Sequence, residues 1–227
     1  SLASRLRKLM NRPVSPSRVG VRRPTSAPRR GHDLQEDALR AVLAEDPNNR
    51  KAFEALASIV RRQAEASADD GDPLTAEHDA EPARRAADLA VWSLGEELAG
   101  NPRAWLPLLE LARLSIADDH EAALRRLATA AERDHTGQAL VEALAILREA
   151  GLHTEALGLG VGHWRPAEHT PEVVRHLVHA ALDADRPAEA AQHLESLDLH
   201  PDTAAASALR AELEPYVARA AHHTIDS

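Results

Sequence analysis

The sequence predicts an all-α fold in which helix pairs are stacked in series. An apolar pattern that ends in a Glu-Ala pair occurs twice, with the same internal spacing. The two copies are Leu140, Ala143, Leu144, Leu147 with Glu155-Ala156, and Val174, Leu177, Val178, Ala181 with Glu189-Ala190. In addition, 44% of the 227 residues are apolar but only five are aromatic, a composition dominated by the helix formers Ala and Leu. A constant period of about 34 residues is typical of helical-repeat arrays.

The charges divide the chain into two parts. Residues 1–30 contain nine cations and no acid, whereas residues 31–227 contain 18 cations and 36 acids. The chain is therefore a basic extension followed by an acidic body. Cysteine is absent, which excludes disulfides, thiolate metal sites and a cysteine nucleophile. The use of 25 Arg against 2 Lys, together with the many alanines, suggests a high-GC bacterial source.

The basic extension is predicted to span residues 1–31. Residues 2–10 form a short basic amphipathic segment, because their leucines and Met10 share one face of a helix. Four prolines between 13 and 28 predict a disordered linker over 11–31. We expect no signal peptide, because cations interrupt the apolar residues, and no later run has the length of a membrane span.

We expect the cations of the extension to dock the protein on a larger assembly. They are Arg5, Arg7, Lys8, Arg12, Arg18, Arg22, Arg23, Arg29 and Arg30. Alternative partners are RNA or the ribosome, an anionic membrane surface, and the acidic body of the protein itself. The extension contains no aromatic residue, so a nucleic-acid contact would be made with phosphates rather than by base stacking.

Residues 32–222 are predicted to form the helical domain. A lone helix over 33–46, with Asp33 as its N-cap, precedes the turn at 46–49. The second helices of the pairs are expected at 82–99, 119–133, 153–164 and 187–198, and an acidic loop insertion at about 66–81. A capping helix follows from 203 to about 221, in which Pro215 is expected to cause a kink or a break. Residues 223–227 are expected to fray.

The turn and the helix after it carry a family resemblance. Asp46-Pro47-Asn48-Asn49, followed by Ala52, Phe53, Leu56, Ala57 and Val60, resembles the junction and first helix of a tetratricopeptide repeat (TPR). The pattern continues from Trp105, Leu140 and Val174, and Glu149-Ala150-Gly151 is similar to the turn inside a repeat. The resemblance covers roughly 33–200. It implies a right-handed solenoid of about four antiparallel helix pairs, whose first helices line a concave binding face.

Projection of these first helices assigns residues to the concave face. We expect a groove that includes Lys51, Arg61, Arg103, Leu106, Arg113, Arg148, Arg175 and His179. Arg61, Arg113 and Arg148 occupy equivalent positions on three successive first helices, a ladder suited to an extended or acidic ligand. The alternative is that these arginines pair with acids of neighbouring helices.

Other clusters do not predict a catalytic, cofactor or metal site. Gly158, Gly160 and Gly162 lack the spacing of a phosphate-binding loop and indicate a loosened helix or a close helix contact. The acids near 69–81 lack the spacing of an EF-hand. His176 and His179 lie one turn apart without a zinc motif, and their partial burial would make binding sensitive to acid. No nucleophile elbow, P-loop, kinase or zincin motif is present.

The sequence therefore predicts a non-catalytic, cytoplasmic adaptor or scaffold that binds a protein or peptide partner and no small-molecule substrate. One alternative is an accessory protein of a ribonucleoprotein or nucleic-acid complex, bound through residues 1–30. Another is a peripheral membrane-surface protein anchored by residues 2–12, which a single short helix would hold only weakly.

Overall fold

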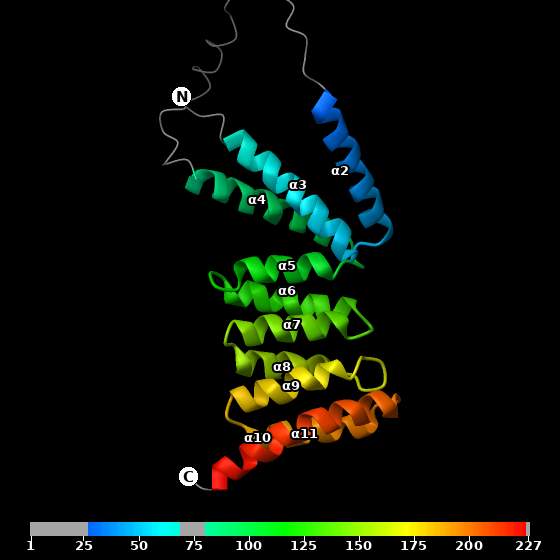
Figure 1. Ribbon diagram of the computed structural model, residues 1–227, viewed down its shortest axis with the longest axis vertical. Helices are drawn as coiled ribbons and strands as arrows, with labels where there is room; N and C mark the ends of the chain where they lie inside the picture. Colours follow the sequence, from blue (N-terminus) through cyan, green and yellow to red (C-terminus); the bar gives the residue numbers. More distant parts are fainter. Residues whose placement is uncertain (1–26, 69–79, 226–227) are drawn as a thin grey trace, which may run out of the picture. The chain divides into compact units, whose positions relative to one another are not determined.

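The computed structural model describes residues 27–68 and 80–225 (Figure 1). The chain divides into two compact units, residues 1–34 and Gln35–Ser227, and the packing below is that of the second unit. Predictions for residues 1–26 and for most of the acidic loop lie outside the described residues.

The described residues are helical throughout, connected by turns, and contain no strand. The helices are α2 (Ala27–Glu45), α3 (Arg50–Ala68), α4 (Ala80–Ala99), α5 (Leu106–Ser115), α6 (His120–Arg133), α7 (Gln138–Glu149), α8 (His153–His163), α9 (Glu172–Asp183), α10 (Pro187–Glu195) and α11 (Thr203–Ile225), with a 3₁₀ turn at Ser196–Leu199. The all-α prediction is confirmed for this part of the chain.

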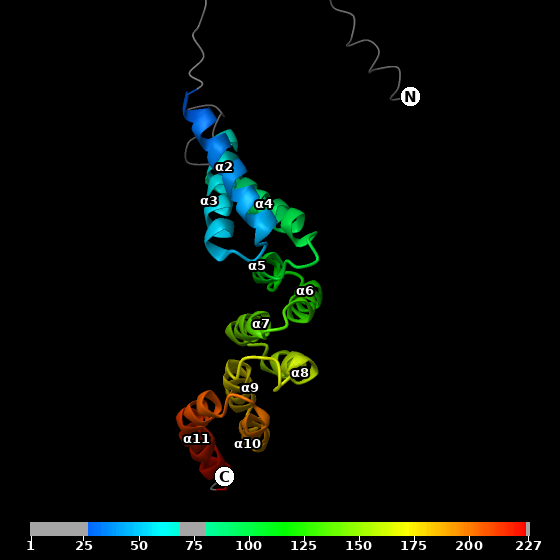
Figure 2. The same ribbon diagram turned by 90° about the vertical axis from the view of Figure 1, so that its right-hand side faces the viewer.

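From α3 onward, each helix packs against the next one in the chain. In addition, α5 contacts α7, α7 contacts α9, and α9 contacts α11. Figure 2 shows α5, α7 and α9 on one side of the unit and α6 and α8 on the other. We call the surface of α3, α5, α7, α9 and α11 the odd-numbered face.

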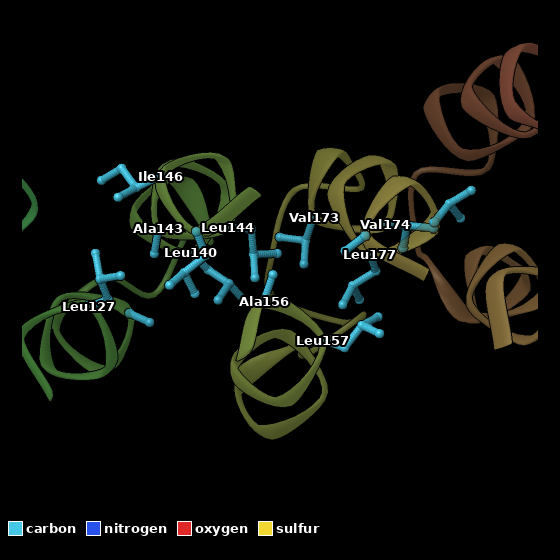
Figure 3. Close-up of a cluster of buried hydrophobic side chains, with 14 of the residues drawn as sticks. Leu127, Leu140, Ala143, Leu144, Ile146, Ala156, Leu157, Val173, Val174 and Leu177 are labelled. Carbon is cyan, nitrogen blue, oxygen red and sulfur yellow. The ribbon is translucent and has the colours of Figure 1, made fainter. Parts of the chain in front are cut away.

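The buried apolar residues form two clusters. The larger one extends from α5 to α11, and Figure 3 shows its centre, where Leu140 and Leu144 of α7 lie near Ala156 of α8, and Leu177 of α9 lies near Leu157. The smaller one joins α2 to α5 and consists of Leu43, Ala52, Phe53, Leu56, Leu94 and Leu106. Trp105 packs against both clusters and connects them.

Two turns of the larger region share a backbone conformation at positions 34 residues apart. Gly151 after α7 has φ 74° and Asp185 after α9 has φ 57°, both left-handed. The next amide in each turn donates back into the preceding helix, from Leu152 to Leu147 and from Arg186 to Ala181, at 2.8 Å in both cases. Such a left-handed residue ends a helix and reverses the chain.

The glycine run at 158–162 lies inside α8, and helix packing requires glycine at one of its positions. A Cβ on Gly160 would lie 2.3 Å from a methyl carbon of buried Leu177, whereas Gly158 and Gly162 face open space. The close helix contact is therefore confirmed at Gly160, where glycine lets α8 approach α9.

Polar side chains connect the two core regions at the start of α5. The Asn48 side-chain oxygen accepts from the amides of Trp105 and Leu106 at 2.8 and 3.0 Å, and its nitrogen donates to the Arg103 carbonyl at 2.9 Å. Arg133 donates to three carbonyl groups around the turn after α4, at Ala99, Asn101 and Ala104. These bonds satisfy helix ends that would otherwise lack partners.

Three helix ends differ from the predicted boundaries. Helix α2 begins at Ala27 rather than 33, because Pro28 falls in its first turn, where no amide donor is required; Asp33 is consequently not an N-cap. Helices α3 and α4 extend into both ends of the predicted 66–81 loop. Helix α11 continues through Pro215 to Ile225, into the segment expected to fray. Ala211, whose carbonyl loses its donor at Pro215, is exposed to water, and buried Leu213 and Val217 hold the helix in place.

Candidate functional site

The odd-numbered face carries most of the predicted groove residues. Lys51 and Arg61 lie on α3, Arg113 on α5, Arg148 on α7, and Arg175 and His179 on α9. Two predicted positions were wrong. Arg103 lies in the turn before α5, which begins only at Leu106, and its side chain donates to the Glu45 carbonyl at 3.4 Å. Leu106 is fully buried, because the Asn48 cap turns the first residue of α5 into the core.

Several of these arginines pair with an acid on the next odd-numbered helix. Arg113 lies 3.6 Å from Glu149 of α7, and Arg148 lies 3.2 Å from Asp183 of α9. Arg175 donates to Glu212 of α11 at 2.9 Å, and this bond holds the pKa of the Glu212 carboxyl below its usual value. The internal pairing that the sequence left as an alternative is therefore present on this face.

Arg50, which the sequence analysis missed, adds a pairing that crosses three helices. From the start of α3 it lies 3.5 Å from Glu110 of α5 and also pairs with Glu142 of α7. Arg50 is the first residue of α3, directly after Asn49, whose side-chain oxygen accepts from the Ala52 amide at 3.0 Å. No local pattern marks its pairing, because Glu110 and Glu142 lie far along the chain.

The pairing is much tighter at one end of the face than at the other. Arg148 and Arg175 are 24% and 27% exposed, and both make contacts at hydrogen-bond distance. Arg61 and Arg113 are 46% and 44% exposed, and their closest acids lie at 3.8 and 3.6 Å. Exposed pairs at such distances contribute little stability. Arg61 and Arg113 are therefore the arginines of this pairing series that a partner can engage at the lowest cost.

A cleft of about 380 Å³ lies beside these two accessible arginines, between α3, α4 and α5. Phe53, Ala57, Val91 and Leu114 supply apolar walls, and Arg61 and Glu110 lie among its polar lining. Leu114 is 41% exposed although it is a large apolar residue. The sequence analysis missed the cleft; its one sequence signal is a leucine that follows Arg113, outside the apolar stripe of α5.

At the opposite end of the face, burial favours the neutral forms of His176 and His179. Burial, and after it the neighbouring Arg148, lowers the pKa of His176 to about 4. Nδ1 of His176 lies 3.4 Å from the Arg148 guanidinium, so the imidazole accepts this hydrogen bond. Burial also lowers the pKa of His179, which packs edge-on against Tyr216 with ring centres 5.7 Å apart. Within 27–68 and 80–225, no group of three or more His, Cys, Asp or Glu side chains is arranged to hold a metal ion.

Of the cations in the basic extension, Arg29 and Arg30 fall in α2, and the others lie outside the described residues. Among the described helices, none combines the length and apolar character needed to cross a bilayer. No family model matches the chain, and no curated protein matches its sequence.

Proposed function

We propose that this protein is a non-catalytic adaptor or scaffold whose odd-numbered face holds a segment of another protein. Its helices form a right-handed solenoid of antiparallel pairs resembling the TPR class, and the basic extension over residues 1–31 docks it on a larger assembly. Support for the repeat comes from the two left-handed turns, at Gly151 and Asp185, and from the direct contacts between alternate helices.

One observation carries the binding role. The accessible arginines and the apolar cleft occur together, on the same end of the same face. Protein recognition sites combine an apolar pocket that anchors one side chain with polar groups that fix its orientation. Elsewhere on this face, the charges of Arg148 and Arg175 are already satisfied by Asp183 and Glu212.

The absence of cysteine allows a direct test by site-specific cross-linking. A photo-cross-linker attached to Ser58→Cys, an exposed position of the cleft, is compared with one attached to Glu121→Cys, which is exposed on α6. In a native lysate treated with nuclease, we expect the Ser58 probe to capture a discrete protein that the Glu121 probe does not capture.

Other results would contradict this proposal. Equal capture from both positions would show that the odd-numbered face is not selective. Capture that disappears with nuclease, together with binding that weakens steeply as salt is added, would favour the ribonucleoprotein alternative. Lipid products in place of protein products would favour the membrane-surface alternative.

A further inference from the structure

The ion pairs of the odd-numbered face repeat at equivalent positions. Arg113 of α5 pairs with Glu149, the last residue of α7, and Arg148 of α7 pairs with Asp183, the last residue of α9. The two arginines, like the two acids, are separated in sequence by one repeat period. Each such pair, which we call a rung, joins an arginine to an acid at the end of the next odd-numbered helix.

The same pairing pattern identifies one rung that lacks its acid. Arg61 of α3 occupies the position equivalent to Arg113 and Arg148. Moving back from Glu149 by the 35 residues that separate Arg148 from Arg113 places its acid at Leu114, one residue before the end of α5 at Ser115. Arg61 reaches Asp88 of α4 instead, at 3.8 Å and with both side chains about half exposed or more. Arg61 and Leu114 both line the cleft described above, so a leucine stands where the rung requires a carboxylate.

We propose that the cleft between α3 and α5 binds a partner segment through one acidic side chain and a neighbouring aliphatic side chain. The carboxylate completes the rung at Arg61, and the aliphatic group packs against Leu114, Phe53 and Val91. This inference rests on the protein-binding role proposed above and specifies the chemistry of the partner.

The charges around the cleft favour a single acid over an acidic run. Glu110 is already held between Arg50 at 3.5 Å and Arg113 at 4.0 Å, which leaves Arg61 as the cation available in the lining. Glu54 also lines the cleft, seven residues before Arg61 on α3, which corresponds to about 10 Å along the helix. A second partner carboxylate near Glu54 would be repelled.

The shape of the cleft favours a short anchor. Helix α3 slopes away from α5 along its length (Figure 1), and the apolar floor is contributed by α4 through Val91. A volume of about 380 Å³ lies at the small end of ligand sites, enough for one or two aliphatic side chains but not for a whole helix.

The test uses a library of random 12-residue peptides displayed on phage, selected against the full-length protein and against Leu114→Glu. The new carboxylate completes the rung within the chain, so it competes with the partner acid while remaining compatible with an exposed helix position. On the wild-type protein, we expect enriched peptides that place Asp or Glu within four residues of Leu, Ile, Val or Met. On Leu114→Glu, this motif is lost.

The best peptide is then synthesised and measured by fluorescence anisotropy. We expect Leu114→Glu and Arg61→Glu each to weaken it at least tenfold, and a peptide whose acid is replaced by Lys to regain binding to Arg61→Glu. Leu89→Glu is the matched control, because Leu89 is an exposed leucine of α4 outside the cleft lining, and it should leave affinity unchanged. Circular dichroism confirms that each variant is folded.

Different results would contradict the cleft proposal and the adaptor proposal. Enriched peptides that bind the wild-type and Leu114→Glu proteins equally, or that contain no acid, overturn the cleft proposal and leave the adaptor role intact. Absence of any enriched peptide also overturns the cleft proposal, and the adaptor role is then decided by the cross-linking at Ser58 and Glu121.

Discussion

The helices before Leu106 and those after it bury their apolar residues in different ways. From α5 to α11 the helices are mostly short, recur with a nearly constant period, and share one continuous core. In the earlier region, α3 and α4 have 19 and 20 residues and are held by a much smaller cluster. Between α5 and α11 alternate odd-numbered helices contact one another, whereas α3 slopes away from α5 and leaves the cleft between them open (Figure 1). The proposed binding cleft therefore lies in the less regular region.

The largest expected difference is in the cores. Leu144→Ala removes a fully buried side chain from the centre of the larger cluster and should cost about 3–4 kcal/mol of unfolding free energy. Leu43→Ala in the smaller cluster should cost about 2 kcal/mol, because α2 can relax around the cavity. Urea denaturation followed by circular dichroism measures both. Equal costs would mean that the two clusters behave as one core.

The connection between the regions is tested by Asn48→Ala. This change removes the acceptor for two amides at the start of α5 and one donor to Arg103, and should cost about 1–2 kcal/mol. Hydrogen exchange should show faster opening of the amides of Trp105 and Leu106. Unchanged protection there would show that Asn48 does not hold the two regions together. Asn101→Ala serves as a comparison, because its side chain caps only the local turn.

Lowering the pH should destabilise only the later region, from α5 to α11. Because the folded pKa of His176 is depressed to about 4 from the ordinary 6.5, its contribution to stability is complete above pH 6.5 and is lost as the pH falls toward 4. The pKa values of His169, His179 and His193 are also lowered, by burial, and act in the same direction.

The loss from His176 between pH 7 and pH 5 should be on the order of 1 kcal/mol, after allowance for its partial exposure. His176→Gln should remove this part of the pH dependence and leave that of His169, His179 and His193, whereas exposed His120→Gln should leave all of it. Between residues 35 and 99 the sequence contains one histidine, His78, so α3 and α4 should retain their exchange protection over this range. A larger loss of protection in α3 and α4 than in α9 would contradict the comparison.

The smallest effects are expected from the ion pairs themselves. Arg175→Ala should cost up to about 1 kcal/mol, because it breaks close contacts with Glu172 and Glu212. Arg113→Ala should cost less than about 0.5 kcal/mol, because its pairs are long and exposed. Denaturation at low and at high salt separates them, since screening should reduce the difference between the two variants. A larger cost for Arg113→Ala would refute the distinction between tight and loose pairing.

The sequence predicted the helices of the later region well, because their boundaries are set locally. Gly151 and the Asp119 cap of α6 mark helix ends through backbone conformation and short-range hydrogen bonds. The position of Arg103 was wrong because the start of α5 is fixed by Asn48, far earlier in the chain. The cleft could not be predicted, because it depends on the angle between α3 and α5. The sequence of one helix alone does not determine that angle.

The rungs also affect how many helices such a protein can contain. Arg113 with Glu149, and Arg148 with Asp183, occupy equivalent positions and join the same kinds of charge. A genetic deletion from Leu114 through Arg148 would therefore set Arg113 in the place of Arg148, opposite Asp183, and a duplication would add a rung of the same kind. Charge matching thus permits arrays of different length to arise by unequal recombination. Such a deletion or duplication would leave the irregular region before Leu106 unchanged.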